Sequence, residues 1–109
     1  MLPQVTVSVR SALKDARDHL NVVKAGLRRP GLFDDELLED FGDGQLNIAA
    51  VAKFTIEQVA LWKAEPLLST GERTALDILE KNATELQSTV AETIAGVNKM
   101  REQLRQKKR

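Results

Sequence analysis

Apolar residues recur with helical spacing through the C-terminal third of the chain. Steps of three and four residues connect them, with Thr93 filling one gap, and this is a heptad pattern held over about four repeats. These residues are Leu76, Leu79, Ala83, Leu86, Val90, Val97, Met100 and Leu104. Ser69 and Glu72 have the spacing of a capping box just before the run. The pattern predicts one long helix over residues 69–105, on the order of 54 Å at about 1.5 Å per residue.

A second apolar stripe lies near the N-terminus. From Val9 to Leu27 its members are three or four residues apart, and Pro30-Gly31 follows it. Proline and glycine end helices, and the cations Arg28 and Arg29 suit a helix C-terminus. We expect one helix over about residues 4–29.

The middle of the chain predicts two further helices. Residues 33–41 form a short amphipathic pattern with one acidic arc, and Gly42 and Gly44 indicate its end. From about residue 43 or 44 to residue 64 the pattern is apolar on two sides, with Phe54 and Leu61 on the second side. A helix of that kind is expected to contact more than one neighbour.

These elements together predict an all-α protein. We expect an up-down bundle of three long helices plus one short acidic helix, with an extended C-terminal helix. The 109 residues form a single domain in this interpretation, and about residues 106–109 are a frayed basic tail.

Composition narrows the class of protein. The chain has no cysteine, so disulfides, thiolate metal sites and a cysteine nucleophile are excluded. No apolar run approaches the roughly 20 residues of a membrane span, and the first residues lack the pattern of a secretory signal. We therefore expect a soluble, cytoplasmic protein with a largely aliphatic core.

The predicted helix lengths suggest a binding surface. The long helix extends beyond the helix before it, so its distal apolar edge is expected to need a partner, and a homodimer or higher homo-oligomer would supply one. The alternative is that the N-terminal helix covers this edge within one chain. The expected partner-binding residues are Phe54, Leu61, Leu86, Val90, Ile94, Val97, Met100 and Leu104.

Charge is distributed in blocks although the formal net charge is zero. The first 29 residues are basic, residues 30–52 carry six acids and no Lys or Arg, and the C-terminus is basic again. The C-terminal basic patch consists of Lys99, Arg101, Arg105, Lys107, Lys108 and Arg109. With the N-terminal helix it gives an alternative function, association with nucleic acid through phosphate contacts, but base-stacking aromatic residues are not interleaved with it.

No catalytic constellation is apparent. His19 is the single histidine, and its neighbours lack the lysine and glycine spacing of a phosphotransfer site, so we expect a surface histidine paired with Asp15. The acids of residues 36–43 lack the ligand pattern of a calcium loop or a di-iron bundle, which favours a solvated face or a docking site for a basic partner. We expect no enzyme activity, no metal and no cofactor.

The sequence thus favours a small helical protein–protein interaction module, an adaptor, chaperone-like, scaffold or regulatory protein. It would act through its C-terminal helix and through self-association.

Overall fold

The computed structural model describes the backbone of residues 2–29 and 31–107, and the side chains of residues 6–29 and 31–106. Within that part of the chain the fold is all-α, as predicted, and consists of three helices without a strand. They are α1 (Leu2–Arg28), α2 (Asp35–Lys63) and α3 (Thr70–Lys107). The molecule is a rod with extents of 62 × 18 × 16 Å.

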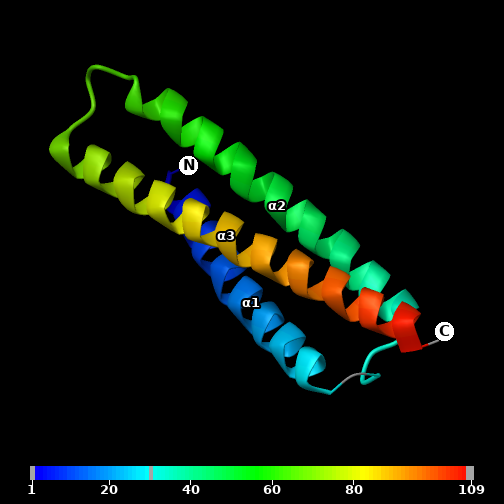
Figure 1. Ribbon diagram of the computed structural model, residues 1–109. Helices are drawn as coiled ribbons and strands as arrows, with labels where there is room; N and C mark the ends of the chain where they lie inside the picture. Colours follow the sequence, from blue (N-terminus) through cyan, green and yellow to red (C-terminus); the bar gives the residue numbers. More distant parts are fainter. Residues whose placement is uncertain (1, 30, 108–109) are drawn as a thin grey trace.

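Helix α3 is the central element. Both α1 and α2 pack along it, and α1 and α3 run in the same direction while α2 runs in the opposite one (Figure 1). The apolar stripe of α3 is thereby enclosed from two sides. This arrangement explains why α3 needs a wide apolar edge although it is the longest helix.

The core is divided into three clusters along the rod, and each contains residues of all three helices. The first consists of Val9, Val59, Leu76 and Leu79. The second consists of Leu13, Ala16, Ala52, Leu86 and Val90. The third consists of Val23, Leu38, Val97 and Met100.

A polar layer lies between the second and third clusters. Gln45 and Thr93 are buried there, and the Oγ1 of Thr93 donates a hydrogen bond to the carbonyl of Thr89. This bond satisfies the hydroxyl within its own helix, so Thr93 continues the apolar seam at little cost.

The predicted short acidic helix and the helix after it are one element. Gly42 and Gly44 do not end a helix, because α2 passes through both without interruption. Neither has a positive φ angle, which among the described glycines is found at Gly31 alone (φ 91°). A helical glycine costs about 1 kcal/mol relative to alanine, and the buried residues on either side of these two, Leu38 and Gln45, keep α2 packed against the core.

Two helix starts follow local capping rules. Asp34 is the N-cap of α2, and its Oδ1 accepts a hydrogen bond from the backbone N–H of Leu37 at 2.7 Å. The predicted capping box before α3 is confirmed. The N–H of Glu72 donates to Ser69 Oγ at 3.1 Å, and the N–H of Ser69 donates to Glu72 Oε1 at 3.2 Å.

Gly96 marks a close approach of α1 and α3. A Cβ at this position would overlap Cγ1 of Val23, a branched side chain in the third cluster. From its spacing alone, a glycine inside a helix is compatible with a close approach of a neighbouring helix or with a surface position, and the packing against Val23 decides for the former. Gly44, by contrast, has no neighbouring atom within 4 Å of such a Cβ.

We predict that Gly96→Ala destabilises the protein and that Gly44→Ala stabilises it. Both substitutions gain about 1 kcal/mol of helix propensity, but an extra methyl in a tight contact costs about 1–3 kcal/mol. The net loss for Gly96→Ala is therefore expected to be up to about 2 kcal/mol. Urea unfolding followed by circular dichroism measures both values, and equal stabilisation by the two substitutions would contradict the close approach.

The capping box also predicts a pH dependence. The hydrogen bond from the backbone N–H of Ser69, with a further contribution from its hydroxyl, lowers the pKa of Glu72 from its ordinary value of 4.5. A lowered pKa in the folded state means that this stabilisation is complete above the unfolded pKa and is lost as the pH falls through the folded pKa. An NMR titration of the Glu72 carboxyl should show the low pKa, and Ser69→Ala should move it upward.

Candidate functional site

Helix α2 carries an exposed apolar stripe on the side opposite its buried residues. It consists of Leu46, Ala50, Phe54 and Leu61, and we call these four residues the outer face of α2. Their spacing places them on one side of the helix, opposite the buried Ala52 and Val59. The exposed fractions are 57% for Leu46, 61% for Phe54 and 67% for Leu61. Single exposed apolar residues are ordinary, but an aligned set on one helix face is typical of a contact surface.

The outer face has a defined electrostatic setting. Lys53 lies at the edge of the stripe. Glu57, three residues after Phe54 and four before Leu61, lies within it, so the face carries one charge of each sign. The N-terminal end of the same helix is acidic, with Glu36, Asp40 and Asp43 exposed. The apolar stripe and the acidic end therefore follow one another along α2.

The C-terminal helix does not expose the predicted binding edge. Leu86 and Val90 are fully buried, and Val97 and Met100 are only 2% and 5% exposed, all in the chain's own core. Ile94 and Leu104 pack against this core and are partly buried. The expectation of an uncovered edge at these positions was wrong. It depended on a short helix beside α3, whereas the continuous α2 begins at Asp35, next to Arg101, and covers the distal half of α3.

Of the predicted binding residues, Phe54 and Leu61 are the two that are exposed on the surface. The sequence placed them on a second side of their helix, and the structure agrees with that placement. It did not single out Leu46, because the break assumed at Gly44 left this residue in the first turn of a separate helix. The signal was present in the spacing of Leu46, Ala50 and Phe54.

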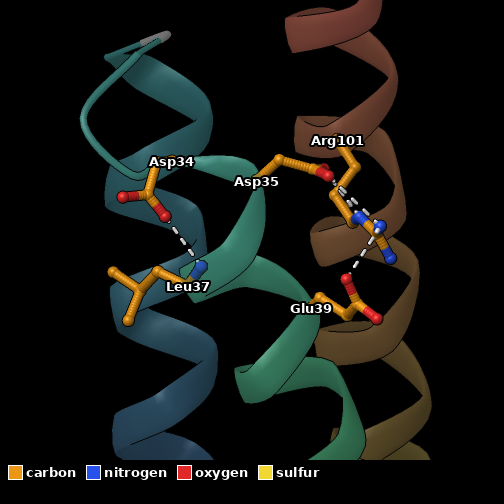
Figure 2. Close-up of polar contacts among 5 residues, drawn as sticks. All are labelled: Asp34, Asp35, Leu37, Glu39 and Arg101. Atoms are coloured by element: carbon orange, nitrogen blue, oxygen red, sulfur yellow. Dashed lines mark hydrogen bonds and ion pairs between the residues drawn. The ribbon is translucent and has the colours of Figure 1, made fainter.

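Arg101 belongs to an ion-pair cluster between α2 and α3. Its Nε donates to Asp35 Oδ1 at 2.8 Å, and its Nη2 lies 3.8 Å from Glu39 Oε2 (Figure 2). The hydrogen bond to Asp35 raises the pKa of the Arg101 guanidinium above its ordinary value. The ion pairs of Arg101 therefore connect the start of α2 to α3.

The rest of the predicted basic patch is only partly described. Lys99 and Arg105 are exposed on α3. Lys107 is the last residue of that helix and its side chain lies outside the described residues, as do Lys108 and Arg109. The patch therefore contributes two exposed cations in the part of the chain that the structure describes.

His19 is partly buried and does not have the predicted pairing. Its Nδ1 is 3.0 Å from Nε2 of Gln45, and its ring meets Phe41 edge-on with centroids 5.3 Å apart. The predicted partner Asp15 is exposed and is not among these contacts. His19 thus connects α1 to α2 at the polar layer, since the amide of Gln45 reaches it from the facing helix.

An apolar groove adjoins this contact. It has a volume of about 210 Å³ and lies between α1 and the first turns of α2. Val23, Leu38 and Met100 of the third cluster line it together with Phe33 and Phe41, and Val22 and Leu37 are exposed along it. The groove has no polar lining group, so nothing in it would orient a polar ligand.

The described residues contain no group of three or more His, Asp or Glu side chains placed to hold a metal ion. Over the same residues, no helix has the length and apolar character that crossing a bilayer requires. No protein-family model, curated protein or solved structure matches the chain.

We predict that a charged substitution strongly destabilises the protein at a buried apolar position and has little effect on stability at an exposed one. Val97→Glu would bury an unpaired carboxylate in the third cluster, and a cost of several kcal/mol is expected, enough to unfold a small domain. Leu61→Glu should change the stability by about 0.5 kcal/mol or less, as exposed positions do. Circular dichroism during thermal unfolding compares them. A folded Val97→Glu variant that has lost only an oligomer would contradict the intrachain core.

Proposed function

We propose that the protein is a small helical interaction module whose binding surface is the outer face of α2. Among the described residues, Leu46, Phe54 and Leu61 belong to none of the three core clusters, and α2, which carries them, packs against α3 on its other side. The observation that carries the proposal is the alignment of these large apolar side chains, each more than half exposed, on one side of a single helix. Burying such side chains on binding is favourable by about 1.5–3 kcal/mol each.

An adaptor, scaffold or regulatory role fits this architecture. The site offers shape and apolar area but no nucleophile, no general base with a reacting partner, and no polar pocket. Recognition would follow the helix-in-groove mode, in which apolar anchors on one helix face recur at steps of three, four or seven residues; Leu46, Ala50, Phe54 and Leu61 follow one another at steps of four, four and seven.

Nucleic-acid association through the basic tail and α1 is the second proposal. It is supported by exposed cations on α1, among them Arg10, Lys14 and Lys24, together with Lys99 and Arg105 on α3. Two cations are already engaged within the fold, because Arg17 pairs with Glu85 and Arg101 pairs with Asp35. We therefore favour protein binding.

The proposal predicts site-dependent cross-linking in cells. A benzophenone amino acid at position 54 should yield covalent adducts with proteins, and Leu61→Glu in the same chain should suppress them by adding a charge to the apolar face. The matched control is the same probe at Val7 of α1, which is 65% exposed and lies outside the outer face. Immunoblotting after irradiation measures the adducts. Equal adducts at positions 54 and 7, or none at position 54, would contradict the proposal.

A further inference from the structure

We infer that the outer face of α2 binds the same face of a second copy, with the two α2 helices antiparallel about a two-fold axis near Phe54. This inference rests on the proposed function and names the partner of that site. It is carried by the spacing of the large exposed apolar residues along α2, which is nearly symmetric about Phe54.

The apolar residues are nearly palindromic. Leu46 precedes Phe54 by eight residues and Leu61 follows it by seven. In an antiparallel pair centred there, Leu46 of each copy therefore faces Leu61 of the other, with an offset of about one residue, roughly 1.5 Å. Phe54 lies against Phe54 of the second copy. The same patch thus fills both halves of the contact, as a two-fold interface requires.

The charges on the outer face favour this arrangement. Lys53 is one residue before Phe54 at the edge of the face, and Glu57 is three residues after it within the face. The antiparallel arrangement places Lys53 of each copy opposite residue 55 of the other, within two residues, roughly 3 Å along the axis, of Glu57. This gives two reciprocal pairs of opposite charge against a single Lys53–Lys53 contact at the same axial separation. Lys53 and Glu57 have no ion pair with a described residue of their own chain that would have to be broken.

The acidic end of α2 disfavours the parallel alternative. In a parallel in-register pair Glu36, Asp40 and Asp43 would each lie beside the same residue of the second copy, and like charges in contact are repulsive. In the antiparallel pair Asp43 falls opposite about residue 64, after the end of the facing α2 at Lys63. Both acidic ends then project beyond the contact.

The contact is short, so the assembly should be reversible. The stripe from Leu46 to Leu61 is about 22 Å long at roughly 1.5 Å per residue. One helix pair of this length gives an interface at the low end of the size range of specific complexes. We expect monomer and dimer to exchange within the concentration range of analytical ultracentrifugation.

Single cysteines test the geometry, because the chain has none of its own. Under oxidation Phe54→Cys should form a disulfide-linked dimer, since Cα atoms at the centre of a packed helix pair come within disulfide range. Leu46→Cys alone and Leu61→Cys alone should not, whereas their mixture should form the heterodimer. Val7→Cys, an exposed position on α1, is the control for random collision. Non-reducing electrophoresis should show dimer formation at least about tenfold faster for Phe54→Cys than for this control.

A charge exchange tests the reciprocal pairs. Lys53→Glu should weaken the dimer, because it places a carboxylate beside Glu57 of the second copy, and Lys53→Glu with Glu57→Lys should restore it. Phe54→Glu should weaken dimerisation by about 30-fold or more, the effect of losing a central anchor. Sedimentation equilibrium measures each dissociation constant, and circular dichroism confirms that each variant is folded.

Two results would overturn the inference. One is a wild-type chain that stays monomeric up to millimolar concentration, and the other is Leu46→Cys that cross-links to itself as fast as Phe54→Cys, which indicates parallel helices. If either occurs while the benzophenone at position 54 still captures other proteins in cells, the second copy is excluded and the proposed function stands. If the benzophenone at position 54 also captures no other protein, both the inferred dimer and the proposed function are contradicted.

Discussion

The fold depends on covering the apolar edge of α3 from two sides. This helix contributes most of the fully buried large side chains, among them Leu76, Leu79 and Leu86, and a single neighbour would leave part of that edge in water. Helices α1 and α2 each cover one side of this edge. Each core cluster accordingly contains residues of all three helices. The continuity of α2 is therefore a condition of the fold, since a break after Phe41 would uncover Val97 and Met100.

The polar layer adds a constraint on how the helices align. Gln45 is 1% exposed, and its Nε2 bonds to His19 while its Oε1 accepts no hydrogen bond from a described residue. A buried amide loses its bonds to water and is tolerated where a partner is in reach. Sliding α2 along the rod by one turn would move Gln45 away from His19 and against apolar side chains. The layer therefore favours one register of α2 against α1.

The sequence was informative where local rules decide the outcome. The seam of α3, its capping box at Ser69 and Glu72, and the helical character of residues 4–29 were all predictable, because capping and periodicity involve residues a few positions apart. Gly42 and Gly44 are positions where contacts between distant residues, not local rules, decide the outcome. A glycine inside a helix lowers its local stability, but whether the helix continues is decided by what the flanking residues bury, and those contacts come from α1 and α3.

The predicted break in α2 explains why the sequence favours an exposed apolar edge on α3. A divided α2 predicts that α3 extends past its neighbour, so the apolar edge of α3 becomes the expected partner site. With α2 whole, the edge is internal and the unexplained apolar area moves to the far side of α2. His19 was equally beyond sequence reasoning, because its contacts Gln45 and Phe41 are on another helix.

The inner side of α2 follows from the constraint that fixes the core, whereas the outer face of α2 does not. Helix α2 must be apolar on its inner side to cover α3, and this requirement is met by Leu38, Ala52 and Val59. Among the described residues, Phe54 and Leu61 belong to none of the three core clusters, so the packing within one chain does not require them. A charged residue at either position would leave the core unchanged. The second apolar side of α2 is therefore a feature that folding does not explain, and binding is the physical process that would make use of it.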